Sequence, residues 1–131
     1  MQTSFTDKQL LDKDNKSSES ILRKCVHCGM CNATCPTFCV NGEELEGPRG
    51  RIYLIKDMLE NKKPANKKVV KHIDSCLSCY SCMTTCPSGV NYMHLIDHGR
   101  NYVEETYKRP FFDRLFRNVL SFVLPRPKVF L

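Results

Sequence analysis

The sequence lacks features that would place it in several common classes of protein. It has no apolar run long enough to cross a bilayer, and its polar start, "MQTSFTDKQLLDKDNK", contains no apolar signal-peptide core. We therefore expect a cytoplasmic chain, with a peripheral position at the inner face of the membrane as the alternative. It also has no Gly-rich phosphate-binding loop, no G-x-G-x-x-G and no nucleophile–base pair. This predicts a chain that neither binds flavin nor converts a substrate by itself.

Strand patterns are scarce too, because no run alternates convincingly between apolar and polar residues. Apolar residues instead recur at three- and four-residue steps. This predicts helices from Arg51, from about Asn91 and from Phe111, with shorter ones at 20–24 and 69–73. The inward side of the helix after Asn91 is predicted to carry Met93, Ile96, Val103 and Tyr107. The fold class is thus expected to be mostly α.

The length, 131 residues, is that of one domain with tails. We expect a flexible N-terminal tail at 1–19, a core domain at 20–108 and an amphipathic C-terminal segment at 109–131. One stripe of that last segment is apolar, and its opposite face is polar. An apolar face of this size on a small domain predicts that the segment begins a further domain or docks onto a partner subunit.

Cysteine, by contrast, is abundant, with nine residues in all. Most of them fall in two runs, "CVHCGMCNATCP" from Cys25 and "CLSCYSCMTTCP" from Cys76, which share the spacing C-x2-C-x2-C-x3-C-P. Thiols of a cytoplasmic chain stay reduced, which favours metal ligation over disulfides. Zinc sites use separated C-x2-C pairs, so a repeated run of three thiols fits zinc poorly. A zinc-binding interaction module remains an alternative.

The spacing indicates two [4Fe–4S] clusters. In two-cluster ferredoxins with this run, the first three cysteines hold one cluster and the fourth ligates the other. We therefore expect the first cluster on Cys25, Cys28, Cys31 and Cys86, and the second cluster on Cys76, Cys79, Cys82 and Cys35. Clusters linked in this way lie close together and accept one electron at a time, which predicts a short electron-transfer path.

Residues beside the ligands are candidates for cofactor binding. Pro36 and Pro87 fix the backbone where the chain leaves each fourth cysteine, and Gly29 lets the backbone approach sulfur. Arg49 and Arg51 either offset cluster charge or contact a partner, or they are solvated in a Gly-Pro turn. The negative clusters account for part of the +6 formal charge, so no nucleic-acid partner is expected.

Two further features are expected to be structural. Cys39 has no counterpart in the second run and is predicted to be a small buried residue. His94 and His98 have metal-ligand spacing on a predicted helix, but no third ligand accompanies them, so no metal is expected there.

Three segments, "CVHCGMCNATCPTF", "GEELEGPRGRIYLIKDMLE" and "CLSCYSCMTTCPSGVNYMHLIDHGR", carry a resemblance to a known family. Over roughly residues 20–108 the chain resembles the N-terminal ferredoxin domain of glycolate oxidase (glycolate dehydrogenase) iron–sulfur subunits. Related subunits serve lactate, glycerol-3-phosphate and heterodisulfide oxidoreductases. The resemblance implies an α-helical ferredoxin fold and a flavin-containing dehydrogenase partner that oxidises glycolate to glyoxylate. It also implies a quinone or other, membrane-associated, acceptor.

The expected function is therefore that of an electron-transfer subunit in an oxidoreductase complex. The alternatives are a related complex for one of the other substrates, or a free ferredoxin-like carrier without a fixed partner. Members of the family continue into CCG-type cysteine repeats that this sequence does not contain, so we expect either a fragment or a reduced version.

Overall fold

The computed structural model describes residues 1–127, and within that range it contains helices and no strand. The prediction of a mostly α fold is confirmed. The elements are α1 (Asp7–Leu10), α2 (Lys13–Lys24), η1 (Met30–Asn32), α3 (Pro36–Asn41), η2 (Glu44–Glu46), α4 (Pro48–Asn61), α5 (Lys67–Asp74), α6 (Ser81–Thr84), α7 (Tyr92–Thr106) and α8 (Phe111–Val123).

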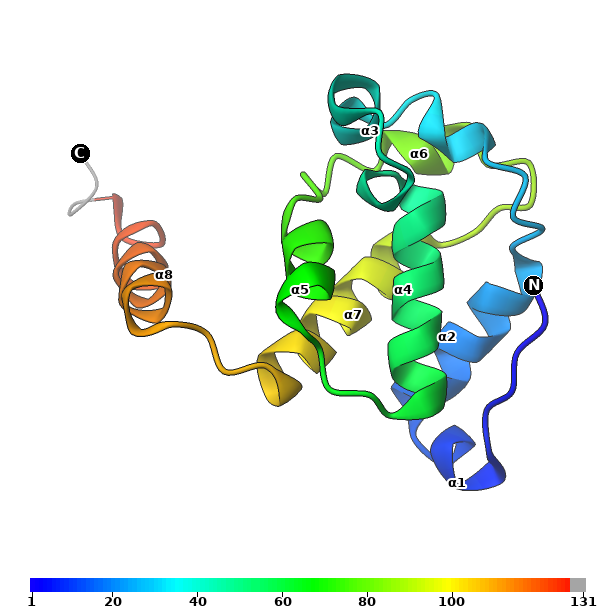
Figure 1. Cartoon of the computed structure of the whole chain (residues 1–131), viewed down its shortest axis with the longest axis horizontal. Coiled ribbons are helices and arrows are strands. Elements are labelled where there is room, and N and C mark those ends of the chain that lie inside the picture. Colours follow the sequence, from blue (N-terminus) through cyan, green and yellow to red (C-terminus); the bar gives the residue numbers. More distant parts are fainter. Residues whose placement is uncertain (128–131) are drawn as a thin grey trace.

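Helix α4 stands at the centre of a small bundle, with α7 crossing it and with α2 and α5 packed on α7 (Figure 1). The two central helices approach closely at Gly99, where a Cβ atom would lie 2.8 Å from Cγ1 of Ile55. The short elements that carry the cysteines gather at the N-terminal end of α4 (Figure 1). The bundle thus forms a base for the cysteine loops.

The core is formed by one apolar side of each bundle helix, with Leu22, Ile52, Ile55, Leu59, Ile73, Leu95, Ile96 and Val103 among its buried residues. One predicted core position is wrong. Met93 is 43% exposed, because the buried side of α7 passes through Leu95 and Ile96 instead. Ile96 and Val103 are buried as predicted, and Tyr107 is partly buried against the same core.

Local chemistry explains where the helices begin. The Asn66 side chain accepts a hydrogen bond from Val69 N at the start of α5, and Asn91 accepts one from His94 N at the start of α7. Helix α4 begins at Pro48, three residues before the predicted start, because proline is well suited to the first helical turn. Gly50 is required there, since a Cβ atom would lie 2.3 Å from the carbonyl oxygen of Glu44.

The N-terminal residues differ from the predicted flexible tail. The predicted boundary at residue 19 falls inside α2, which runs from Lys13 to Lys24 behind an Asp12 cap. The buried side chain of Gln9 donates to the backbone oxygens of Leu59 and Glu60. These polar contacts could not be read from the apolar pattern, which is sparse before residue 20.

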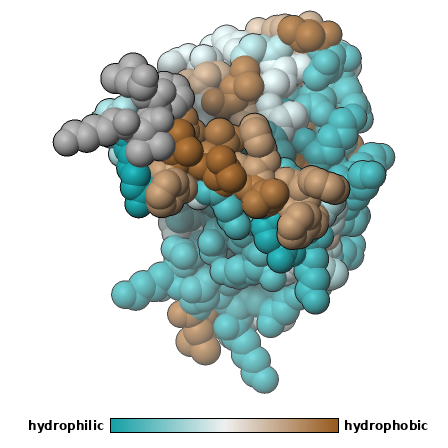
Figure 2. Space-filling view, turned by 90° about the vertical axis from the view of Figure 1, so that its left-hand side faces the viewer, coloured by the Kyte–Doolittle hydropathy of each residue, from teal (hydrophilic) through white to brown (hydrophobic). Residues whose placement is uncertain are grey.

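Helix α8 lies apart from the bundle, joined to α7 by an extended segment (Figure 1). None of its residues is buried, and its apolar stripe, predicted from the sequence, is exposed. Figure 2, which faces this side of the molecule, shows hydrophobic side chains gathered in one band. Among the described residues, no helix has the length and apolar character needed to cross a bilayer.

Candidate metal centre

Two adjoining cavities at the N-terminal end of α4 are lined by thiols. The first measures about 450 Å³ with its opening to solvent, and its lining includes Cys25, Cys28, Cys31, Cys82 and Cys86. Three of these come from the first cysteine run and two from the second. The structure thus brings the fourth cysteine of the second run to the loop of the first.

The second cavity, about 290 Å³, has the reciprocal composition. Its thiols are Cys76, Cys79 and Cys82 of the second run together with Cys35 of the first. Pro48 and Tyr92 line both cavities, as does Cys82, so the two spaces are separated by little more than a few side chains. All cysteines are free thiols.

The two loops wind in the same way. The residues on either side of the second cysteine of each run have positive φ: His27 (59°) and Gly29 (84°) in the first, Ser78 (51°) and Tyr80 (56°) in the second. Left-handed backbone is uncommon outside glycine, so its recurrence at matching positions is a shared structural feature. The sequence repeat is therefore also a repeat of backbone conformation.

The cofactor-binding candidates beside the cysteines also reach the cavities. Pro36 lines the second cavity and Pro87 the first, next to the cysteine that each follows. Gly29 and Arg49 line the first cavity. A Cβ atom at Gly29 would lie 3.1 Å from Nη1 of Arg49, so the glycine lets this arginine lie against the loop.

The electrostatics of the thiols favour a bound cationic group. Burial, together with the neighbouring Cys25, Cys28 and Cys86, raises the pKa of the Cys31 thiol to about 11. Burial and four neighbouring thiols raise the pKa of Cys82 to about 12. Thiolates crowded in this way repel one another unless metal ions compensate their charge. The donor set is all sulfur, which suits iron–sulfur clusters.

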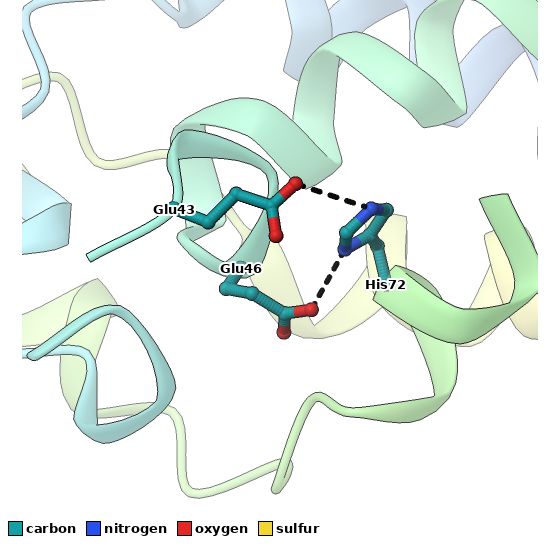
Figure 3. Close-up of side chains that lie close together, drawn as sticks. All are labelled: Glu43, Glu46 and His72. Atoms are coloured by element: carbon teal, nitrogen blue, oxygen red, sulfur yellow. Dashed lines mark hydrogen bonds and ion pairs between the residues drawn. The ribbon is translucent and has the colours of Figure 1, made fainter. Parts of the chain in front are cut away.

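A buried polar network that sequence reasoning missed lies behind the second cavity. The sequence left open whether Arg51 offsets cluster charge, contacts a partner or is solvated in a turn. In the structure it is only 1% exposed and donates to the Glu46 carboxylate. Glu46 Oε1 lies 2.7 Å from His72 Nδ1, and Glu43 Oε1 lies 3.7 Å from the other ring nitrogen, Nε2 (Figure 3). Burial opposes ionisation of Glu46, but hydrogen bonds from Ser75 and His72 hold its pKa below the usual range.

Glu43, Glu46 and His72 are close enough to be considered as metal ligands. Their geometry is instead that of a hydrogen-bonded chain, since Glu46 and His72 are in direct contact. The guanidinium of Arg51, on the other oxygen of Glu46, would also repel a cation. In the sequence, these Glu, Arg and His residues stand in separate segments, and no spacing pattern links them.

The structure also places Cys39 and the pair His94 and His98, which were both expected to be structural. Cys39, predicted to be buried, is exposed, because the short α3 turns its sulfur outward toward the Ala33 carbonyl. His94 and His98 lie 6.1 Å apart between ring centroids, and His98 Nδ1 is hydrogen-bonded to the Ser18 hydroxyl. Among the described residues no carboxylate or thiol joins these two histidines in a metal-binding group.

A helical bundle with two adjoining thiol-lined cavities defines a two-cluster helical ferredoxin. The chain belongs to the 4Fe-4S dicluster domain family, which matches residues 21–90, and it holds two [4Fe–4S] clusters. No solved structure gives a significant match.

Curated relatives are iron–sulfur subunits. The chain is 52% identical over 130 residues to the glycolate oxidase iron-sulfur subunit of Escherichia coli, covering 99% of this chain and 32% of that protein. It is 32% identical over 117 residues to a probable glycolate oxidase iron-sulfur subunit of Bacillus subtilis, covering 86% and 26%. A mitochondrial succinate dehydrogenase iron-sulfur subunit of Candida glabrata is 27% identical over 84 residues, covering 60% and 33%. The chain therefore spans about a third of the length of these relatives. The similarity to glycolate oxidase iron–sulfur subunits expected from the motifs is confirmed.

Proposed function

We propose that this chain is the electron-transfer part of a flavin-linked glycolate dehydrogenase, in which glycolate is oxidised to glyoxylate. The observation that carries the proposal is the pair of adjoining thiol-lined cavities with Pro48, Tyr92 and Cys82 in common. Bound [4Fe–4S] clusters exchange single electrons, so two neighbouring sites suit a relay between a flavin and a one- or two-electron acceptor.

The first cluster is assigned to Cys25, Cys28, Cys31 and Cys86, and the second cluster to Cys76, Cys79, Cys82 and Cys35. The lining of the two cavities supports this crossed arrangement, because each contains the fourth cysteine of the other run. Cys82 touches both cavities, and we assign it to the second because its own run supplies the other two loop ligands there.

Glycolate is assigned as the substrate from the similarity to two glycolate oxidase iron–sulfur subunits. The substrate chemistry and the flavin belong to a partner dehydrogenase subunit, and a quinone or similar acceptor receives the electrons. The exposed apolar face of α8 supports a fixed protein partner over a free carrier, since a freely diffusing carrier would leave that face in water.

The metal content tests the cluster assignment. Anaerobically purified protein is expected to contain about eight iron and eight sulfide per chain and to give [4Fe–4S] electron paramagnetic resonance (EPR) signals after reduction. Protein that contains two zinc ions and no sulfide would end the cluster assignment.

The substrate is tested in the complex with the flavin subunit. Glycolate is expected to reduce the clusters rapidly under anaerobic conditions, whereas lactate and glycerol 3-phosphate serve as matched comparisons. Faster reduction by either comparison substrate would reassign the complex to that substrate. A quinone analogue added afterwards should reoxidise the clusters.

A further inference from the structure

The first turn of α4 lies between the two cavities and sends one arginine to each. Pro48 lines both cavities, Arg49 lines the first and Arg51 the second. The N-terminus of this 14-residue helix also carries the positive end of the helix dipole. The two arginines differ sharply in their surroundings, and so do the two cavities.

Arg51 is fixed in a buried position. Its Nη1 atom lies 3.8 Å from Sγ of Cys35 and is oriented to donate to it. Nε donates to the His72 carbonyl oxygen at 2.6 Å, and Nη2 donates to Glu46 at 3.1 Å. The guanidinium thus presents one edge to the cluster ligand and another to the carboxylate that balances its charge.

Arg49 is held much less firmly at the first cavity. Its side chain is 39% exposed, and its Nε atom lies 3.4 Å from Glu44 Oε1 without the geometry of a hydrogen bond. Charges exposed to solvent are strongly screened, whereas a charge in a buried site is screened much less and acts more strongly on its neighbours. Arg49 therefore stabilises added negative charge less than Arg51 does.

Other hydrogen-bond donors also favour the second cavity over the first. At the second cavity the Tyr92 hydroxyl donates to Cys76 Sγ at 3.6 Å, and Arg100 Nη2 donates to the Cys76 carbonyl oxygen at 2.6 Å. At the first cavity the corresponding donor is the backbone N–H of Val90, 3.4 Å from Cys86 Sγ. Solvent exposure of the thiols does not distinguish the two cavities, because each has one exposed thiol: Cys28 in the first and Cys79 in the second.

Reduction of a cluster adds one negative charge. Nearby cations and hydrogen bonds to the ligand sulfurs favour the reduced state and raise the reduction potential. The Glu46 carboxylate, whose pKa is held below the usual range by hydrogen bonds from Ser75 and His72, offsets part of the Arg51 charge. It pairs with Nη2, however, while Nη1 is the atom that faces Cys35.

We propose that the second cluster has the higher reduction potential and that Arg51, acting through its contact with Cys35, sets this difference. The first electron to enter the domain then rests on the cluster held by Cys35, Cys76, Cys79 and Cys82. This inference rests on the crossed ligation given under the proposed function.

The test is a redox titration of the full chain with both clusters bound, followed by EPR. Cys79→Ser identifies the signal of the second cluster, because it replaces one of that cluster's ligands. In the unmodified chain that signal should appear first on reduction. Arg51→Met should lower its reduction equilibrium constant at least tenfold, equivalent to 59 mV for one electron. Arg51→Lys should restore part of the shift, and Arg49→Met, the matched control, should leave the second cluster's potential unchanged.

Two further variants guard against misfolding. Arg51→Met combined with Glu46→Gln avoids an unpaired buried carboxylate, and Tyr92→Phe removes one donor with almost no change in shape. Both should lower the same potential, the second by a smaller factor. The inference is overturned if the first cluster is reduced first, or if chains with full iron content show no shift in the second potential. Absence of iron and sulfide from the unmodified chain would instead overturn the proposed function.

Discussion

Arg109 and Asp74 form a two-point ion pair, with Nη1–Oδ2 at 2.7 Å and Nη2–Oδ1 at 3.2 Å. The Arg109 side chain is buried, and the neighbouring carboxylates raise its pKa above the usual range. Asp74 also accepts from Arg117 of α8 at 3.0 Å. One carboxylate at the end of α5 therefore holds the segment before α8 through Arg109 and α8 itself through Arg117.

Arg109→Ala should release α8 from the bundle. We expect a loss of about 1–2 kcal/mol in local stability, less than for a fully buried pair because Asp74 is partly exposed. Hydrogen exchange should show faster exchange of α8 amides, with α4 amides unchanged as an internal reference. Arg126→Ala is the matched control, since the Arg126 side chain donates to the Phe122 carbonyl oxygen and lies over the Phe122 ring, and Phe122 belongs to α8 itself. Equal exchange of α8 in both variants would contradict this role of Arg109.

Cys35→Ser should damage the second cluster before the first. Cys35 lies in the cavity with Cys76 and Cys79, and its own run lines the other one. Iron analysis and EPR should show loss or a changed signal of the second cluster. Cys39→Ser should leave both clusters intact, because Cys39 is exposed and lines neither cavity. Loss of the first cluster alone in the Cys35 variant would disprove the crossed ligation.

Replacing Phe112 and Phe116 of α8 with serine should weaken binding to the flavin subunit that we propose as the partner. Both rings are exposed, and burying one aromatic side chain contributes about 1.5–3 kcal/mol. Each substitution should therefore raise the dissociation constant at least tenfold, as measured by calorimetry under anaerobic conditions. Asn118→Ser on the polar face is the control, and iron content should be unchanged in all variants. If binding is unaffected, this face does not contact the subunit.

The stability of the α2–α7 contact should depend on pH through His98. Burial lowers the pKa of His98 below its ordinary value of 6.5, so the folded protein prefers the neutral ring. As pH falls below about 6.5 the unfolded chain takes up a proton that the folded chain resists, and stability is lost until the folded pKa is passed. The anaerobic thermal midpoint should therefore fall between pH 7 and pH 5.5.

His98→Asn is the matched variant for this effect, because the Asn side chain can still accept from Ser18 but does not titrate. The difference in midpoint between the two pH values should shrink in it. An unchanged pH dependence would show that another group is responsible.

The cysteine spacing predicted a crossed arrangement of the two runs, because C-x2-C-x2-C geometry is local and the fourth cysteine follows a known crossing rule. The thiols of each predicted set line one cavity, and Cys82 lines both, so the ligand assignment itself stays a prediction. Helix phases were largely predictable from apolar steps, except at Met93, where the neighbouring Leu95 and Ile96 occupy the core. Polar contacts were not. Gln9 is buried because it bonds to the end of α4, and Arg51 is buried because partners from three segments surround it. Such pairings depend on tertiary structure that no spacing encodes.

Each thiol-lined cavity draws on both cysteine runs, and this has a consequence for biosynthesis. A growing chain that has been translated only as far as Ser75 carries three thiols of the first cavity, while Cys86 has still to be added. It also carries only Cys35 of the second set. If the proposed crossed ligation holds, neither ligand set is complete before the second cysteine run has been synthesised, so we expect neither cluster to be completed earlier.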